Sequence, residues 1–368
     1  MGNNIPSAKH YCYLGITFSL SGSFKTATNL LRQKALRAYF GLKSEVDLQN
    51  ISKVAVLKLI DSLILPVMSY GIEVQVWGAS TVGIKAFTCE TNHNPKQSML
   101  SAMSTDPCER LQLTILKWVV GVGKRTSNVA IWGDCGRTPI IVRFVKQMTD
   151  YFNRLAKLDI DDSNTLVRHA FAEQKKLNLS WFKNLDSMMR MLDHDKLEYQ
   201  YYYALLCQER ANNRFTEAWE KERLRNSKLS FYNDVKESFG IEPYLRKGSG
   251  KGSNLIAKIR MCSHKLNIET GRYGSKSGSI LNRACNFCCH LPTLELLLKL
   301  PEANPIIEDE VHFLGSCSRY QTMRASIKEP TKTLLLNGAY KTLFLEEHIG
   351  EFTKFLTQIF KTRFPAKK

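Results

Sequence analysis

The apolar residues of the chain recur mostly with helical spacing. From Phe24 to Leu42 they return every three or four positions, so they share one face of a helix, and lysines and arginines occupy the remainder. Similar spacing extends over 109–120 and 141–158, and further helical patterns fill 160–240. The pattern therefore predicts a mainly α protein.

Two stretches depart from this spacing. Residues 11–20 combine aromatic and branched side chains and end at Ser21 and Gly22, which predicts a strand or hairpin arm. Residues 51–77 are strongly apolar, and Pro66 must break or kink a helix there because it lacks a backbone N–H. The sequence therefore predicts a short β element before the helices and an interrupted helix over residues 51–77.

Composition and spacing divide the chain into six predicted segments. In chain order these are a terminal hairpin, a helical domain, a helical connector, a basic linker, a cysteine–histidine module, and C-terminal helices with a basic tail. Their predicted bounds are 1–20, 21–160, 161–240, 241–282, 283–325 and 326–368. The linker is expected to be flexible because basic residues without an acid surround the sequence GSGKGS between Glu242 and Glu269.

The charge balance of the chain points to its partner. The formal net charge is +18 at pH 7, and such an excess favours a polyanion, here RNA or DNA. No segment has the composition of an interfacial helix, and no uncharged stretch is long enough to span a bilayer, so no membrane is expected as a partner. The N-terminus lacks a hydrophobic signal region, which predicts an intracellular protein, nuclear or cytoplasmic, with reduced cysteines.

Four candidate metal ligands lie close together near the C-terminal end. Two residues separate Cys285 from Cys288, and four separate His312 from Cys317. Three thiolates and one imidazole make a closed tetrahedral set, which is typical of structural zinc rather than of a catalytic metal with an open position. The spacing therefore predicts a structural zinc site.

The ligand assignment leaves alternatives open. Cys289 can replace Cys288, and His290 is a weaker substitute for His312. The same cysteines also fit ordinary buried or redox thiols, although their concentration in one stretch favours a metal. One carboxylate among residues 308–310 could accept the second imidazole N–H, or these acids form a solvated turn.

Basic and aromatic residues near these features are the predicted nucleic-acid contacts. They lie on the first helix, in the linker and in the cysteine–histidine module: Lys25, Arg32, Arg37, Arg246, Lys247, Lys251, Arg319, Tyr320 and Arg324. Basic residues on a helix are often only a solvated face. Aromatic residues at helical spacing, such as Trp181 and Trp219, are more often core than platforms for bases.

The order of several motifs resembles one known family. YLGITF at 13–18, the helix that follows, LIDSLILPVMSYGIEV at 59–74, GDCGRTP at 133–139 and the cysteine–histidine module succeed one another as in the C-terminal half of a non-LTR, LINE or jockey-like retrotransposon reverse transcriptase. The resemblance implies that the hairpin ends the palm and that the helices to about residue 158 form a thumb-like bundle. It also implies that 260–325 is the terminal cysteine–histidine region.

The resemblance does not extend to catalysis. A polymerase palm needs an aromatic-x-Asp-Asp turn and a further aspartate to hold two metal ions, and the chain has no such turn. We therefore expect a non-catalytic portion that grips a template–primer duplex or RNA, with the upstream polymerase portion as a partner if the chain is a fragment. The alternative is a protein-interaction scaffold that uses the zinc module and the leucine-rich run 294–300.

Overall fold

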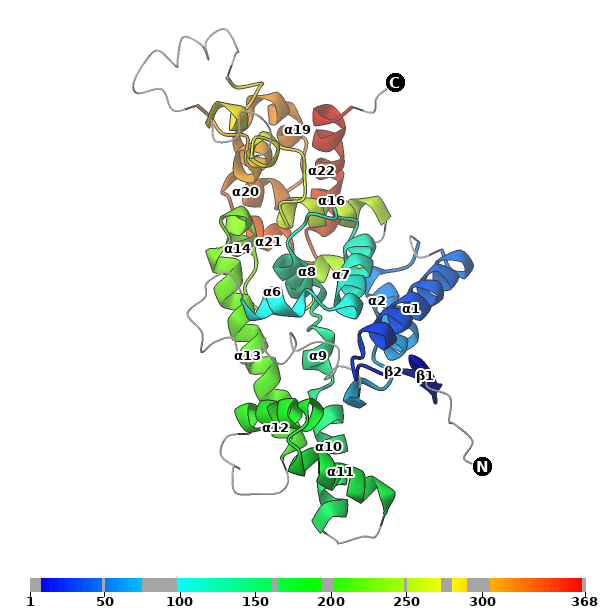
Figure 1. The fold of residues 1–368 in the computed structure, drawn as a ribbon. Coiled ribbons are helices and arrows are strands. Elements are labelled where there is room, and N and C mark those ends of the chain that lie inside the picture. Colours follow the sequence, from blue (N-terminus) through cyan, green and yellow to red (C-terminus); the bar gives the residue numbers. More distant parts are fainter. Residues whose placement is uncertain are drawn as a thin grey trace. The chain divides into compact units, whose positions relative to one another are not determined.

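The computed structural model describes most of the chain and is mainly helical. The described residues are 8–47, 50–74, 98–160, 165–193, 202–247, 250–272, 280–289 and 305–365. In this part, helices account for nearly all regular structure, and one two-stranded sheet lies near the N-terminus (Figure 1). The predicted mainly α class is confirmed.

The chain forms two compact units, and each is discontinuous in sequence. Unit 1 consists of Met1–Val46, Lys58–Thr114 and Arg137–Glu222. Unit 2 consists of Asp47–Leu57, Ile115–Gly136 and Arg223–Lys368. The predicted segments, by contrast, were contiguous, because composition cannot reveal which distant stretches pack together.

The N-terminal hairpin of unit 1 has the form that the sequence predicted. Strands β1 (His10–Tyr13) and β2 (Ile16–Ser19) are antiparallel, and Tyr11 lies opposite Phe18. The Tyr70 hydroxyl donates a 2.6 Å hydrogen bond to the carbonyl of Leu14 in the turn. This bond fixes the hairpin to the helical part of the unit.

The first helices of the chain also follow the predicted pattern. Helix α1 (Lys25–Glu45) packs against a π-helical turn (Ile60–Ile64) and α3 (Leu65–Met68), and α2 (Lys53–Leu59) precedes that turn. Pro66 lies in the first turn of α3, where its missing N–H costs least. The predicted interruption of the apolar helix is therefore a local widening of the hydrogen-bond ladder just before the proline.

Further helices continue through the middle of the chain. They are α6 (Met99–Met103), α7 (Pro107–Val120), α8 (Asn128–Cys135), α9 (Ile140–Arg143), α10 (Val145–Ile160), α11 (Leu166–Lys176), α12 (Ser180–Leu192) and α13 (Ala204–Arg225). In unit 1, α10, α11 and α12 meet through Phe152, Phe171 and Phe182, whose ring centroids lie 5.8–5.9 Å apart. Phe152 and Phe171 are buried in the core, as is Trp219, whereas Phe182 is half-buried.

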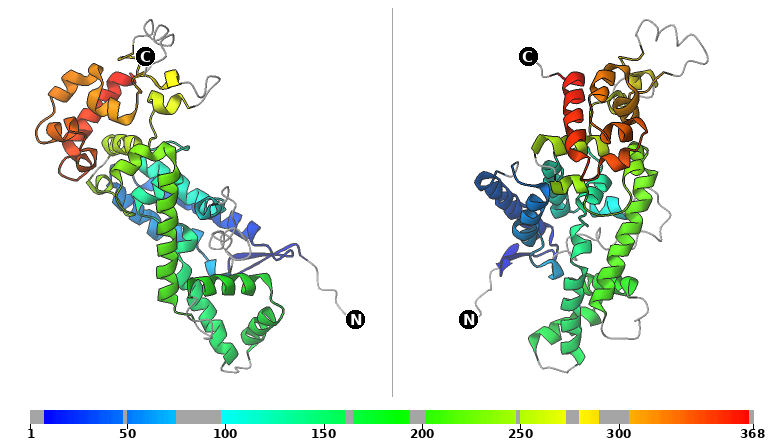
Figure 2. Two further views of the ribbon diagram at one scale, coloured as in Figure 1. Left: turned by 90° about the vertical axis from the view of Figure 1, so that its left-hand side faces the viewer. Right: turned by 180° about the vertical axis from the view of Figure 1, so that it is seen from behind.

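The C-terminal part of unit 2 is built from short helices around a longer one. The α-helices are α14 (Ser230–Val235), α15 (Pro243–Lys247), α16 (Gly250–Arg260), α17 (Asn267–Thr270), α19 (Gln321–Ala325), α20 (Thr331–Leu336), α21 (Tyr340–Leu343) and α22 (Ile349–Arg363). Shorter 3-10 turns cover Ser227–Leu229, Ile280–Arg283 and Ser318–Tyr320, and a π-helix covers His312–Ser316. Helix α22, red in Figure 2, packs against α16 and α19.

The prediction of a flexible basic linker over 241–282 is wrong. Helices α15, α16 and α17 occupy this range, and Tyr244, Leu245 and Ile256 are completely buried. The last four residues of GSGKGS, from Gly250 on, stand at the start of α16, but the residues after them have apolar side chains at helical spacing. Local composition therefore concealed a core helix.

The GDCGRTP motif, residues 133–139, begins within helix α8 and continues beyond its end. Its first three residues end α8, and Gly136 then takes a left-handed conformation with φ +56°. A Cβ atom at this position would lie 2.6 Å from the backbone nitrogen of Ile241, so a side chain does not fit there. Pro139, at the end of the motif, is the residue before α9.

Candidate metal centre

The first half of the candidate metal centre is a tight turn after a short β-bridge. Ala284 pairs with Ile307, and the Cys285 N–H donates to the carbonyl of Ile306 at 2.8 Å. The Cys289 N–H then returns to the carbonyl of Cys285 at 2.9 Å. This turn brings the thiols of Cys285 and Cys288 to the same side.

The second half is a single π-helical turn. The Asp309 carboxylate accepts a 2.7 Å hydrogen bond from the N–H of His312 and so caps the start of the turn. At its end, the Cys317 N–H donates to the carbonyl of His312 at 2.8 Å. The wider π spacing places the side chains of His312 and Cys317 near each other, although four residues separate them.

Together the two halves form a compact set of ligand atoms. The ligand atoms of Cys285, Cys288, His312 and Cys317, here called the cysteine–histidine cluster, all lie within 4.8 Å of one another. The Cys317 Sγ is 3.9 Å from that of Cys285 and 3.7 Å from that of Cys288. Four ligands placed tetrahedrally at about 2.3 Å from zinc would bring sulfur atoms to about 3.8 Å. The cluster could therefore hold a metal ion.

The histidine has one nitrogen available for a metal. His312 Nδ1 lies 3.1 Å from Ser316 Oγ, whereas its buried Nε2 has no hydrogen-bond partner among the described groups. A buried polar atom without a partner is costly, and a bound cation would remove that cost. Ser316 can fix the imidazole tautomer, a role for which the sequence had suggested a neighbouring acid.

The acidic residues next to the histidine have other partners. Glu308 accepts two hydrogen bonds from Arg363, at 2.6 and 2.9 Å, and Glu310 lies 2.7 Å from the imidazole of His264. Asp309 caps the π-helical turn. The sequence had suggested that these acids form a solvated turn or that one of them accepts a hydrogen bond from the His312 imidazole. The structure shows neither arrangement, because each of the three carboxylates is bound to another group.

The thiols and the imidazole perturb one another. The hydrogen bond from Cys317 lowers the pKa of Cys285 to about 3, and the same bond together with burial raises the pKa of Cys317. Burial alone would lower the pKa of His312, but its interactions with Cys285 and Cys288 outweigh burial and raise it. One thiolate, that of Cys285, is thus favoured beside the imidazole, and the thiolate is the form in which cysteine binds a metal.

The structure chooses between the two cysteines that the sequence left open. Cys288 belongs to the cluster, whereas the Cys289 thiol points to the carbonyl of Ile306 at 3.8 Å. His290, the substitute considered for His312, lies outside the described residues. Cys288 is therefore the ligand candidate, and its thiol is the least buried of the three.

Two residues predicted as nucleic-acid contacts are instead internal to this module. Tyr320 is completely buried, with its ring 5.1 Å from that of Phe313, and Arg324 is 6% exposed and donates to the carbonyl of Cys317. Their predicted surface contact is corrected, because both side chains support the cysteine–histidine cluster. Arg319 is exposed and lies 5.3 Å from the Phe287 ring centroid.

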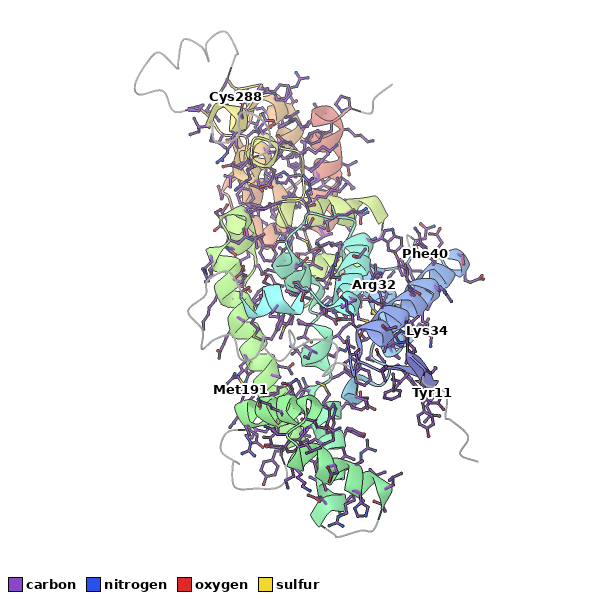
Figure 3. The ribbon with its side chains drawn as sticks, in the orientation of Figure 1. Tyr11, Arg32, Lys34, Phe40, Met191 and Cys288 are labelled. Carbon is purple, nitrogen blue, oxygen red and sulfur yellow. The ribbon has the colours of Figure 1, made fainter. Side chains whose placement is uncertain are left out.

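The other predicted contacts fall on both units. Lys25, Arg32 and Arg37 are exposed on α1, and Arg246 is exposed on α15 (Figure 3 labels Arg32). The side chains of Lys247 and Lys251 lie outside the described part of the chain.

A second buried polar cluster of unit 2 explains the GDCG motif. Its members are called the Asp134 cluster: Asp134, Lys236, Glu242, Tyr244 and Arg260. Arg260 Nε lies 3.2 Å from Asp134 and Nη2 lies 2.9 Å from Glu242, while Lys236 Nζ lies 2.5 Å from Glu242. The Tyr244 hydroxyl donates to Asp134 at 2.9 Å. Sequence reasoning missed this cluster, because its members are far apart in the chain.

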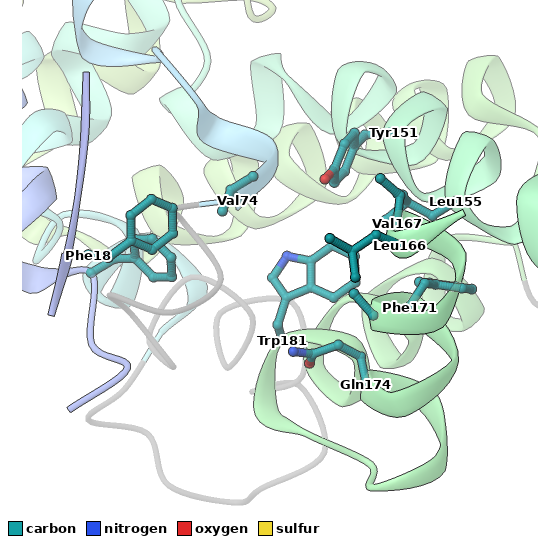
Figure 4. Close-up of a pocket in the computed structure, with 11 residues that line it drawn as sticks. Phe18, Val74, Tyr151, Leu155, Leu166, Val167, Phe171, Gln174 and Trp181 are labelled. Carbon is teal, nitrogen blue, oxygen red and sulfur yellow. The ribbon is translucent and has the colours of Figure 1, made fainter. Parts of the chain in front are cut away.

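Unit 1 contains an apolar hollow of about 470 Å³. Figure 4 shows Trp181, Tyr151 and Phe171 among its lining residues. The Trp181 indole N–H donates a hydrogen bond to the carbonyl of Glu73. The other polar side chains among the described lining residues are those of Tyr151 and Gln174. The described residues that line the hollow include no carboxylate, histidine or cysteine, so they suggest no metal chemistry there.

Comparisons with protein families, curated proteins and solved structures find no match to this chain. None of the described helices is long and apolar enough to cross a membrane.

Proposed function

We propose that this protein binds nucleic acid without catalysing its synthesis, and that it corresponds to the thumb and cysteine–histidine region of a non-LTR, LINE or jockey-like reverse transcriptase. The order of motifs from the hairpin to the cysteine–histidine module supports this assignment. RNA, DNA or a template–primer duplex would be held mainly through phosphates, which position a partner without reading its bases.

The observation that carries the proposal is the charge of the N-terminal region. No acidic residue precedes Glu45, so the hairpin and nearly all of α1 carry only positive charge. Leu31 and Ala35 are buried on α1, while Lys25 and Arg32 are exposed. A helix anchored by its apolar face holds its cations in place, which suits a regular row of phosphates.

Salt titration tests this proposal. Fluorescently labelled duplexes of RNA and DNA are titrated with the full chain at several salt concentrations. The logarithm of the association constant should fall with a slope of about −0.9 for each phosphate contacted on duplex DNA. Replacing Lys25, Arg32 and Arg37 together with glutamine should flatten this slope.

Charge-conserving replacements provide the matched control. The variant with Lys25→Arg, Arg32→Lys and Arg37→Lys should keep the wild-type slope, because phosphate neutralisation depends mainly on charge. A slope near zero for the wild-type chain would refute nucleic-acid binding by its basic surface.

The metal in the cysteine–histidine cluster is proposed to be zinc in a structural role. Three thiolates and one imidazole favour zinc over harder cations such as Mg²⁺, and they leave no open position for substrate. Cys285, Cys288, His312 and Cys317 would hold it and join the turn after residue 284 to the π-helical turn.

The scaffold alternative would use the zinc module together with the leucine-rich run 294–300, which lies outside the described residues. The exposed cations of α1 favour nucleic-acid binding over this alternative.

A further inference from the structure

A rigid basic loop lies between α7 and α8 in unit 2. The Gly123 N–H donates to the Ser263 hydroxyl at 3.0 Å, and Thr126 Oγ1 lies 2.7 Å from the same oxygen. At Gly121, with φ +78°, a Cβ atom would lie 2.3 Å from the side chain of Asn254. These contacts fix the loop, and its tip exposes Lys124 and Arg125.

Three positive charges at this loop, those of Lys117, Lys124 and Arg125, are not paired with a described carboxylate. Lys117 Nζ donates to the carbonyl of Lys124 at 3.1 Å. Burial, and then the charge of Lys228, lower the pKa of Lys117. Among the described residues, no carboxylate forms an ion pair with Lys117, Lys124 or Arg125.

Two further cations of unit 2, one of which is close enough to Lys117 to lower its pKa, share one buried acid. Lys228 Nζ lies 3.0 Å from one Glu269 oxygen, and Arg272 Nε lies 3.2 Å from the other. Glu269 is 5% exposed, so it orients the two cations while leaving a net positive charge. The basic loop surface is defined as Lys117, Lys124, Arg125, Lys228 and Arg272.

We propose that the basic loop surface binds the sugar–phosphate backbone of a nucleic acid, a contact site separate from α1. This inference rests on the proposed function and locates part of it in unit 2. Adjacent cations repel one another in the free protein. A phosphate bound between them would be attracted to each cation, and this attraction would outweigh the repulsion between the cations. The loop is already fixed, so binding orders little additional chain.

The surroundings favour nucleic acid over a membrane or a protein. In the described parts of 115–136, 226–235 and 263–272, no large hydrophobic side chain is strongly exposed, and Leu224, four residues before Lys228, is a single exposed leucine at 60%. Membrane binding needs apolar side chains that enter the acyl boundary, and protein interfaces usually have an apolar or aromatic centre. A polar, cationic surface with fixed geometry instead matches phosphates.

The test removes two charges from the loop tip in the full chain. Lys124 and Arg125 are both replaced with glutamine, and a labelled DNA duplex is titrated at several salt concentrations. If each cation neutralises one phosphate, the slope should decrease in magnitude by about 1.8. The side chains of these residues are exposed at the loop tip, so the fold should be retained, which circular dichroism checks.

Lys175 and Lys176 on α11 provide a charge-matched control, because each already lies near a carboxylate. Replacing both with glutamine should leave the slope nearly unchanged. Equal losses in both variants would mean that only overall charge matters and would overturn the inference. A steep wild-type slope that the loop variant retains would overturn it too, while leaving the proposed function intact.

A flat wild-type slope would instead refute the proposed function itself. Lipid headgroups are another source of phosphate, so binding of the wild-type chain and of the loop variant to vesicles with anionic lipid is measured as well. Loss of vesicle binding in the loop variant, without loss of duplex binding, would overturn the inference in favour of a membrane surface.

Discussion

Two polar clusters in the described part of unit 2, the Asp134 cluster and the cysteine–histidine cluster, differ in how far the chain's own side chains complete them. In the Asp134 cluster, two carboxylates face two cations, and Tyr244 donates a further hydrogen bond. Arg260 Nη1 has no hydrogen-bond partner among the described residues, but the guanidinium carbon is 4.7 Å from the Phe344 ring centroid. In the cysteine–histidine cluster, three thiols crowd together and His312 Nε2 has no partner.

The two clusters therefore differ in the source of their stability. Opposite charges within the Asp134 cluster compensate one another as soon as α8, α15 and α16 pack, so it needs nothing from solution. The cysteine–histidine cluster brings three thiols together with an imidazole nitrogen that has no partner among the described groups, so it should depend on a metal ion. Four predictions test this contrast between a cluster that depends on a metal and one that does not.

The largest effect is expected from loss of the metal. Purified protein should contain about one zinc per chain, and Cys285→Ser, Cys288→Ser, His312→Ala or Cys317→Ser should each release it. Structural zinc binding contributes on the order of 10 kcal/mol, so residues 280–289 and 305–325 should lose protection from hydrogen exchange. Elemental analysis together with exchange measured by mass spectrometry checks both results.

Cys289 provides the matched control for these variants. Its thiol points to the carbonyl of Ile306, outside the cluster, so Cys289→Ser should retain zinc. A folded wild-type chain without metal would refute the zinc assignment and would make the two clusters alike.

A smaller but global effect is expected from breaking the Asp134 cluster. Asp134→Ala leaves Arg260 and Lys236 with Glu242 as their remaining carboxylate, and removing one partner of a buried ion pair costs about 3–5 kcal/mol. Urea unfolding should show this loss equally with zinc and with a chelator. Asp150→Ala, which breaks an exposed pair with Lys146, should cost less than about 1 kcal/mol.

The two clusters also differ in how well the sequence revealed them. The metal ligands could be predicted because each half of the site is local, and a thiol pair two residues apart has few other uses. Ser316 was missed, since its role depends on the π-helical turn. Asp134 and Arg260 are far apart in the chain, so no spacing rule joins them. Composition also made buried α16 resemble a flexible linker, because glycine and lysine counts do not show which residues face a core.

A third prediction concerns the glycine that lets the Asp134 cluster close. Gly136→Ala would force a Cβ into a left-handed residue and against the backbone of Ile241, 2.6 Å away. Strain of this kind costs about 1–3 kcal/mol. Gly250 has φ +69° and open space around it, so Gly250→Ala measures the conformational cost alone. Equal losses of unfolding free energy in the two variants would show that the close approach at Gly136 is unimportant.

The smallest effect is expected at Ser316, which touches the metal site only through His312. Its hydroxyl is 3.1 Å from His312 Nδ1, so Ser316→Ala should leave the tautomer less well fixed while all four ligands stay in place. Loss of such a partner typically weakens metal affinity 10- to 100-fold, which competition with a zinc chelator measures. Ser326→Ala is the control, because the Ser326 hydroxyl donates to the carbonyl of Met323 and not to a metal-ligand candidate. If both variants bind zinc as tightly as wild type, the imidazole is oriented by the π-helical turn alone. The cysteine–histidine cluster would then be held, like the Asp134 cluster, mainly by how its backbone packs.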